Sequence, residues 1–102
     1  SYPGVMTPTE CFAALDAGAD GLKFFPASLI GPNGIAAIKA VLPKSVTTYA
    51  VGGASADNFK QWFDVGITGF GIGSALYKPG RSSDDVFKVA REIVASYDKA
   101  RP

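Results

Sequence analysis

The sequence predicts an α/β fold of parallel strands joined by helices, made of four consecutive βα units. Strand-like and helix-like segments alternate four times along 102 residues, and this order requires parallel strands joined by right-handed crossovers. The first and third units look like copies, since Asp16, Gly18 and Gly21 have counterparts 48 residues later. A (β/α)8 barrel needs roughly 200 residues or more for its eight units. We therefore expect residues 1–102 to form a single partial domain, half of such a barrel.

The first unit and the second strand have clear boundary signals. Residues 1–6 are expected to be the end of a strand. The run Thr7-Pro8-Thr9-Glu10 has the spacing of a capping box with proline at the first helical position, and it predicts a helix over 8–17. After a short turn, an apolar segment over 21–25 predicts a strand, which Pro26 ends.

The later elements follow the same alternation. Gly, Pro and Asn dominate the first segment after Pro26 and predict a loop there, whereas Ser55 is a good N-cap for the third helix. In the last helix, apolar residues such as Val86, Ile93 and Tyr97 recur at helical spacing. The expected positions are a loop over 27–34, a helix over 33–42, a strand over 46–51, a helix from Ser55 to Gly66, a strand over 69–72, a polar segment over 78–83 and then the final helix.

Composition limits the function classes. The chain is 47% hydrophobic and 19% charged, as in ordinary globular proteins. A net charge of +1 without a basic run gives no electrostatic case for binding nucleic acid or a membrane. The chain has no histidine, which excludes histidine triads and most zinc sites. A single cysteine, Cys11, is expected in the core, and with no visible leader or membrane segment we expect a cytoplasmic protein.

Lys23 interrupts the second predicted strand. Because successive strand residues point to opposite faces, Lys23 shares a face with Phe25. One interpretation is that Lys23 lies near the strand end and extends its ammonium to water. The other is that a partly desolvated amine has a lowered pKa and attacks a carbonyl to form a Schiff base. The strand pattern alone leaves both interpretations open.

The last two strands end in glycine-rich turns. Gly52-Gly53 follows the third strand, and Gly73-Ser74 follows the fourth. Glycine lets backbone N–H groups approach phosphate oxygens, and barrels often bind phosphate at the ends of their last two strands. Together with an amine on the second strand, these turns predict a phosphorylated carbonyl compound as substrate.

Five motifs also carry a family resemblance that covers nearly all of the chain. They are Pro3-Gly4-Val5, Thr7-Pro8-Thr9-Glu10, Gly21-Leu22-Lys23-Phe24-Phe25-Pro26-Ala27, Ala50-Val51-Gly52-Gly53 and Gly71-Ile72-Gly73-Ser74-Ala75-Leu76-Tyr77. The chain resembles the C-terminal half of class I aldolases of the 2-keto-3-deoxy-6-phosphogluconate family, most closely the 2-dehydro-3-deoxy-6-phosphogalactonate branch.

The resemblance implies a role for each matching residue. Lys23 matches the Schiff-base lysine, Phe25 lines the substrate channel, and Pro3 and Val51 are implied to contact substrate. The phosphate is implied to bind Gly52, Gly53, Gly73 and Ser74. Val51 favours the galactonate branch because gluconate-specific members typically have threonine there, and Ser28 departs from their common glutamate.

The resemblance also implies partners. No metal or other cofactor is needed, and the phosphorylated keto acid would be cleaved to pyruvate and D-glyceraldehyde 3-phosphate. The family's general acid–base glutamate belongs to the N-terminal half of the barrel, which this sequence lacks, so we expect the chain alone to have little or no turnover. A homo-oligomer, a trimer in the family, or pairing with an N-terminal half is expected.

Three alternatives stay open. The first is a gluconate-specific aldolase, and the second is a non-catalytic phosphate-binding half-barrel module in which Lys23 is only a charge. The third is another phosphate-binding barrel enzyme, an isomerase or a relative of thiamine-phosphate synthase. Such relatives give no reason for the Lys-Phe-Phe-Pro run, which is therefore the discriminating feature.

Overall fold

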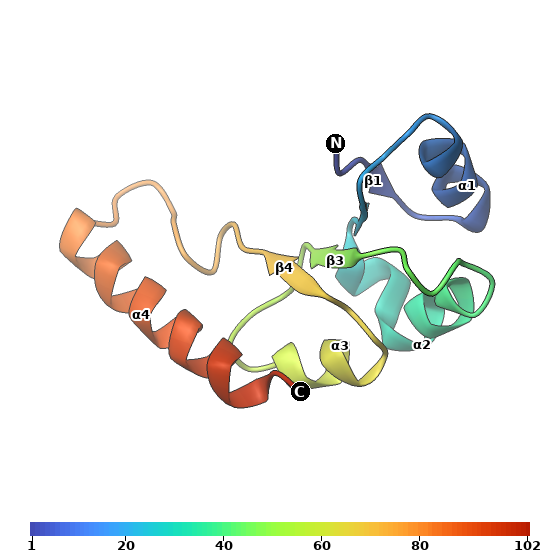
Figure 1. The fold of residues 1–102 in the computed structure, drawn as a ribbon. Helices are drawn as coiled ribbons and strands as arrows, with labels where there is room; N and C mark the ends of the chain where they lie inside the picture. The colour runs from blue at the N-terminus through green and yellow to red at the C-terminus, as the bar shows by residue number, and fades with distance from the viewer.

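The computed structural model describes residues 1–102 as one four-stranded sheet with alternating helices (Figure 1). All strands are parallel, in the spatial order β1-β2-β3-β4, as the βα alternation predicted. The elements are β1 (Gly4–Val5), α1 (Pro8–Asp16), β2 (Leu22–Phe24), α2 (Ala27–Lys39), β3 (Thr48–Val51), α3 (Phe59–Asp64), β4 (Gly69–Gly71) and α4 (Ser83–Ala100).

One face of the sheet is covered and the other is not. Leu22, Phe24 and Ala50 are fully buried on the covered face, where they belong to one core cluster with helical residues such as Ile35 and Trp62. The strand register places Lys23 beside Tyr49, and both side chains lie on the opposite face. The alternation of β2 therefore separates the core from the face that carries the lysine.

Helix α1 begins and ends as predicted. The Thr7 hydroxyl oxygen accepts a hydrogen bond from the Glu10 N–H at 3.2 Å, and the Glu10 carboxylate accepts one from the Met6 N–H at 3.1 Å. The Thr7 bond caps the helix and satisfies an N–H group that the helix leaves free, while the Glu10 side chain reaches back to Met6, one residue before the N-cap. Cys11 in this helix is completely buried and belongs to the core cluster, which confirms it as a core residue.

Two sequence expectations were wrong. The segment after Pro26 is not a loop, because α2 already starts at Ala27. The backbone is non-helical at Gly31 (φ 77°, ψ 160°), so α2 consists of two helical stretches joined at a kink ahead of Pro32. Helix α3 starts at Phe59 rather than after Ser55, because Asn58 takes the N-cap position. The Asn58 side chain accepts a hydrogen bond from the Ser55 N–H at 2.9 Å, so residues 55–58 form a turn ahead of the helix.

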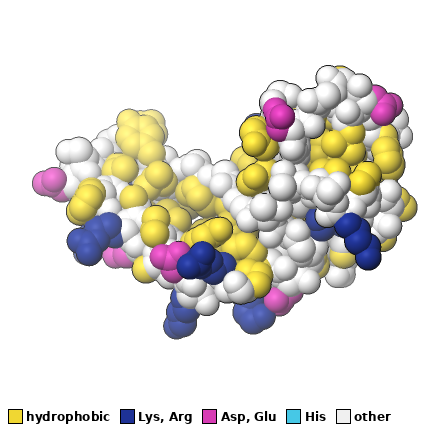
Figure 2. Space-filling model, viewed as in Figure 1, with side chains coloured by type: hydrophobic (Ala, Val, Ile, Leu, Met, Phe, Trp, Pro, Cys, Tyr) yellow, Lys and Arg dark blue, Asp and Glu magenta, His cyan; other side chains and the backbone are white.

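Helix α4 is held at one end by an aromatic cluster. Tyr97 lies against Phe59, Phe63 and Phe70, with ring centroids 5.5–6.3 Å apart. No residue of α4 is fully buried, and Phe87 is 64% exposed. Its C-terminal end lies beside α3, while its N-terminal end extends away from the sheet (Figure 1). Hydrophobic side chains accordingly reach the surface over α4 (Figure 2). No helix in the structure is long and apolar enough to span a membrane.

Candidate active site

Lys23 lies in the middle of β2, on the uncovered face of the sheet. Its N–H donates to the Pro3 carbonyl at 2.9 Å, which ties the strand to the segment before β1. The side chain lines a hollow of about 310 Å³ together with Tyr2, Tyr49, Val51 and others. It makes no hydrogen bond or ion pair within the protein. The ammonium is therefore free to meet a ligand.

Two tyrosine rings border this hollow. The rings of Tyr2 and Tyr49 meet edge to face, with centroids 5.5 Å apart and an interplanar angle of 89°. Tyr49 is also the register partner of Lys23 on the neighbouring strand. Aromatic side chains supply rigid apolar surface at low entropic cost. The lysine thus lies beside aromatic walls in a hollow that no carboxylate lines.

The lysine whose pKa is perturbed lies on the other face. Lys39, at the end of α2, donates from Nζ to the Thr48 hydroxyl oxygen at 3.3 Å. Desolvation by burial lowers the pKa of Lys39 below its usual 10.5. Thr48 belongs to the covered face, since it is fully buried and pairs in register with Leu22. Lys39 therefore does not line the hollow that contains Lys23.

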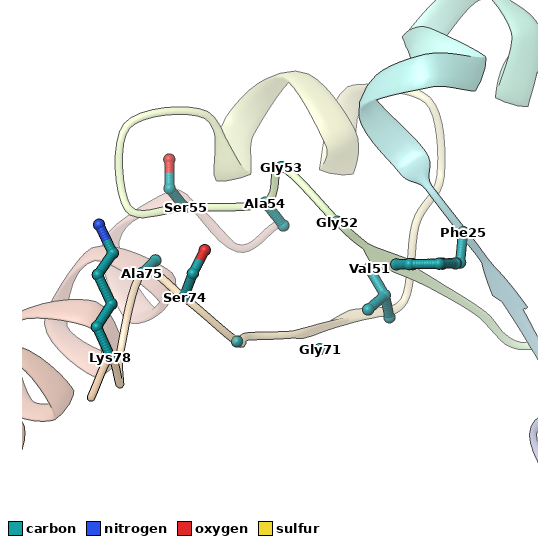
Figure 3. A pocket seen from close by; sticks show the side chains of 11 residues that line it. Phe25, Val51, Gly52, Gly53, Ala54, Ser55, Gly71, Ser74, Ala75 and Lys78 are labelled. Atoms are coloured by element: carbon teal, nitrogen blue, oxygen red, sulfur yellow. The ribbon is translucent and has the colours of Figure 1, made fainter.

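A second cavity, of about 440 Å³, lies at the carboxyl ends of β3 and β4 (Figure 3). It brings together six of the eight residues that the sequence singled out, whereas Lys23 lines the neighbouring hollow. Pro3 lines neither, and its carbonyl accepts the hydrogen bond from the Lys23 N–H. The cavity is lined by Phe25, Val51, Gly52, Gly53, Ala54, Ser55, Gly71, Gly73, Ser74, Ala75 and Lys78.

Only glycine fits at positions 52 and 53. Their φ angles are 88° and 87°, in the left-handed region that side chains disfavour. A Cβ added to Gly52 would lie 3.2 Å from the ring of Phe25. A Cβ added to Gly53 would lie 2.6 Å from the Cβ of Ser28. Backbone and packing thus both exclude larger residues from this turn.

The Asn58 side chain fixes the turn after β3 through hydrogen bonds. Its Oδ1 accepts hydrogen bonds from the Ser55 N–H at 2.9 Å and the Trp62 Nε1–H at 3.1 Å, and its Nδ2 donates to the Gly53 carbonyl at 2.7 Å. On the other side, the Ser28 N–H donates to the Gly52 carbonyl at 3.0 Å. The carbonyls of the turn are thereby fixed, so its N–H groups have a defined position.

Several of the N–H groups along the cavity have no acceptor within the protein. This holds for Gly53 and Ala54 after β3 and for Ser74 and Ala75 after β4. Successive free N–H groups in a turn attract anions. Next to them, a Cβ added to Gly73 would have nothing within 4 Å, so that position is open. The arrangement can bind an anion of the size of a phosphate group.

The two hollows adjoin each other on the same face of the sheet. Val51 and Gly71 line both. The Val51 side chain occupies the space that a larger residue at 71 would need, because a Cβ there would lie 2.7 Å from Val51 Cγ2. A ligand that lies over Val51 would border both the hollow of Lys23 and the anion cavity. The geometry thus suits a phosphorylated carbonyl compound.

Sequence reasoning missed some residues of the site. Lys78 was assigned only to a polar segment, although it follows the Gly73-Ser74 pair closely enough to reach the same cavity. Ser55 was interpreted as a helix cap. Tyr2 and Tyr49 follow the inward alternation of their strands, which was the available signal for them.

Known proteins that resemble the chain share this arrangement of elements. The family model for KDPG and KHG aldolase matches residues 1–91. A Rhizobium meliloti (strain 1021) protein named probable 2-dehydro-3-deoxy-6-phosphogalactonate aldolase is 57% identical over 98 residues, covering 96% of this chain and 46% of that protein. The Escherichia coli (strain K12) 2-dehydro-3-deoxy-6-phosphogalactonate aldolase is 47% identical over 98 residues, covering 96% and 48%.

Solved structures agree. A structure described as native KDPGal superposes with a TM-score of 0.92 at 47% identity, covering 96% of this chain and 48% of that one. Thiamine phosphate pyrophosphorylase from Pyrococcus furiosus superposes less well, with a TM-score of 0.73 at 25% identity, covering 95% and 48%. The chain spans about half the length of the curated relatives it matches. With 91 of its 102 residues inside the family model, the chain belongs to the KDPG and KHG aldolase family.

Proposed function

We propose that this chain supplies the Schiff-base lysine and the phosphate subsite of an aldolase that cleaves 2-dehydro-3-deoxy-6-phosphogalactonate to pyruvate and D-glyceraldehyde 3-phosphate. The observation that carries the proposal is the adjacency of the two hollows, which share Val51 and Gly71. One contains the unpaired Lys23 side chain, and the other is lined by glycines and free N–H groups. Both curated relatives are named for this activity.

The proposed reaction starts at the Lys23 amine. Its lone pair attacks the C2 carbonyl of the keto acid, and loss of water leaves an iminium ion. The iminium nitrogen accepts the electron pair released when the C3–C4 bond breaks, while the C4 hydroxyl loses its proton and becomes the aldehyde of D-glyceraldehyde 3-phosphate. Protonation of the enamine at C3 and hydrolysis of the imine release pyruvate and restore Lys23. The protonated imine is the electron sink, so the mechanism needs no metal or other cofactor.

The remaining lining residues orient the substrate in this proposal. Phe25 lines the cavity, is 51% exposed, and shields the bound substrate from water. Gly52, Gly53, Gly73 and Ser74 hold the phosphate group through their N–H groups and the Ser74 hydroxyl. Val51 lies between the two ends and offers only methyl groups to the middle of the substrate. A hydroxyl-bearing residue at that position would favour the gluconate epimer, the second candidate substrate.

The site as described lacks a carboxylate. No Asp or Glu lines either hollow, and tyrosine phenols are the only acidic groups there. We propose that the proton-transfer group and the carboxylate-binding residues come from further βα units that complete the barrel, so residues 1–102 form one partial domain of it. The chain alone is then expected to turn over little substrate. Assembly as a homo-oligomer, a trimer as in the family, and a cytoplasmic location are parts of the same proposal.

Borohydride trapping tests the proposal directly. The chain is incubated with pyruvate and sodium borohydride, and the adduct is measured by intact mass and located by peptide mapping. We expect one pyruvate-derived adduct on Lys23, and none on the Lys23→Ala variant. Lys39→Met is the matched control, because it removes the lysine of lowered pKa on the covered face and should leave trapping unchanged.

The outcomes separate the candidates. An adduct on Lys23 supports the aldolase, and adding the N-terminal half of the Escherichia coli relative should then restore cleavage. A folded chain without any adduct would refute Schiff-base chemistry and leave a phosphate-binding half-barrel module. An adduct that persists in Lys23→Ala would show that the assignment of the lysine is wrong.

A further inference from the structure

Lys78 is the one charged residue that lines the glycine-rich cavity. It lies in the loop between β4 and α4, and its side chain is exposed. In Figure 3 the side chains of Ser74 and Lys78 rise from this loop on the same side as Ser55 of the neighbouring loop. Two successive strands thus contribute N–H groups to the cavity, and this loop adds a positive charge.

The loop that carries Lys78 has a fixed course. The Gly73 carbonyl accepts hydrogen bonds from the N–H groups of Leu76 and Tyr77, both at 3.0 Å. Arg81 then donates from Nη1 to the carbonyls of Ala75 at 3.2 Å and Leu76 at 2.8 Å, and its own N–H donates to the Lys78 carbonyl at 3.1 Å. Lys78 is therefore attached to a backbone held in place relative to Ser74.

The two basic side chains of this loop have different roles. The Arg81 guanidinium is engaged with main-chain carbonyls of the loop itself and does not line the cavity. The Lys78 ammonium has no ion pair or hydrogen bond within the protein. No carboxylate lines the cavity to neutralise it. An uncompensated charge beside free N–H groups is the arrangement that binds a doubly charged anion well.

We propose that Lys78 is a cationic ligand of the substrate's phosphate group and completes a site otherwise made of backbone N–H groups and the Ser74 hydroxyl. The inference deepens the proposed function and rests on it for the identity of the substrate. The chemical class it recognises is a phosphate monoester dianion, such as that of D-glyceraldehyde 3-phosphate. The flexible lysine stem lets the ammonium follow the phosphate as the substrate enters and the product leaves.

A titration with inorganic phosphate, followed by amide NMR, tests the role of Lys78. The wild-type chain should show shifts concentrated on the amides of Gly53, Ala54 and Ser74. In Lys78→Ala we expect the same amides to respond with a dissociation constant about tenfold higher, since hydrogen bonds to charged groups exceed those between neutral ones. Lys78→Arg should stay within about threefold of the wild type, because it keeps the charge.

Lys44→Ala is the matched control. Lys44 is also exposed, but it lies ahead of β3, at the opposite end of the strand from the cavity. The substitution changes net charge by the same amount and should leave the phosphate affinity unchanged. Raising the salt concentration should weaken phosphate binding more in the wild type than in Lys78→Ala, because screening acts on the charge that the variant lacks.

Three results would overturn the inference. Lys78→Ala binding phosphate as well as the wild type would remove the lysine from the site, and equal losses in Lys78→Ala and Lys44→Ala would reduce the effect to net charge. Absence of any wild-type response at the turn amides would remove the phosphate site as a whole. Pyruvate trapping on Lys23 needs no phosphate, so failure of this inference and failure of the proposed Schiff-base chemistry are seen in separate experiments.

Discussion

Replacing Gly53 by alanine should destabilise the fold, whereas the same change at Gly73 should not. Gly53 has a φ of 87°, and an added Cβ would lie 2.6 Å from Ser28 Cβ. Holding alanine in a disfavoured backbone region costs about 1–3 kcal/mol, and overpacking adds about 1–3 kcal/mol. Together we expect the free energy of unfolding to fall by about 2–6 kcal/mol. Gly73 has neither problem, since its φ is not positive and an added Cβ meets nothing within 4 Å.

Thermal and urea denaturation followed by circular dichroism measure the difference. For a domain of this size, each kcal/mol lowers Tm by about 4–8 °C, so Gly53→Ala should melt at least about 8 °C below the wild type. Gly73→Ala should melt within about 4 °C of it, yet bind inorganic phosphate more weakly, because its methyl group projects into open space at the cavity. Stability and phosphate binding are thereby separated.

A double-mutant cycle isolates the packing contribution. Ser28→Gly removes the Cβ that the new methyl group of Gly53→Ala would meet. The double variant should therefore recover about 1 kcal/mol or more relative to the sum of the single changes, because only the backbone cost at position 53 remains. A Gly53→Ala chain as stable as the wild type, or a cycle without coupling, would refute the reasoning about this turn.

Three other changes have defined outcomes. Asn58→Ala should lower the free energy of unfolding by about 2 kcal/mol in urea titrations, because it leaves the Gly53 carbonyl and the Trp62 indole N–H without their partner. Burial lowers the folded-state pKa of Lys39, so the unfolded chain binds more protons between that value and 10.5, and stability should rise with pH across this window. Lys39→Met should lack the rise. The Cys11 thiol, whose pKa is raised mainly by burial, should react with a thiol reagent only after unfolding.

For each of these three predictions, one result would contradict the reasoning. An Asn58→Ala chain that unfolds at the wild-type urea concentration would mean that solvent replaces its hydrogen bonds. Loss of stability through the alkaline window would reverse the sign assigned to Lys39. Immediate labelling of Cys11 in the native chain would contradict its complete burial.

The sequence predicted the topology because local and long-range signals agree. The Thr7 cap of α1 and the apolar alternation of β2 each rest on residues within a few positions of one another, and the structure has both. The two glycine-rich turns are expected at one phosphate site because barrels often bind phosphate at the ends of their last two strands. The structure places Gly53 and Ser74 in one cavity accordingly.

The misplaced helix boundaries depend on contacts that a local pattern does not contain. Residues 27–30 carry no helix signal of their own, yet the Ser28 N–H is engaged by the Gly52 carbonyl from a different βα unit. Asn58 occupies the N-cap position of α3 without a side-chain capping bond, and its side chain bonds Ser55, Gly53 and Trp62 instead. The start of α2 thus coincides with a contact between different βα units, whereas the start of α3 coincides with Asn58 side-chain bonds to residues three to five positions away.

Lys78 illustrates a different limit. A lysine in a polar loop is usually a solvated residue, and its closeness in sequence to the Gly73-Ser74 pair does not by itself place it in a cavity. The position of Lys78 is set by the hydrogen bonds of the loop to the Gly73 carbonyl and by those from the Arg81 guanidinium to the loop carbonyls. These bonds are seen only in the three-dimensional structure. The chemistry of a loop residue therefore depends on the path of the backbone that carries it.

Helix α4 is held against the protein near its C-terminal end, and this attachment affects how fast its amide hydrogens exchange. The helix has no fully buried residue and is anchored through Tyr97, near its C-terminal end, whereas its N-terminal end follows the loop of Lys78. Amide hydrogens in the first turns of α4 should then exchange faster than those near Tyr97. A bound phosphate would engage the loop and slow that exchange, since a ligand that prefers the docked state stabilises it. Hydrogen exchange would thus detect anion binding at a helix that the anion never touches.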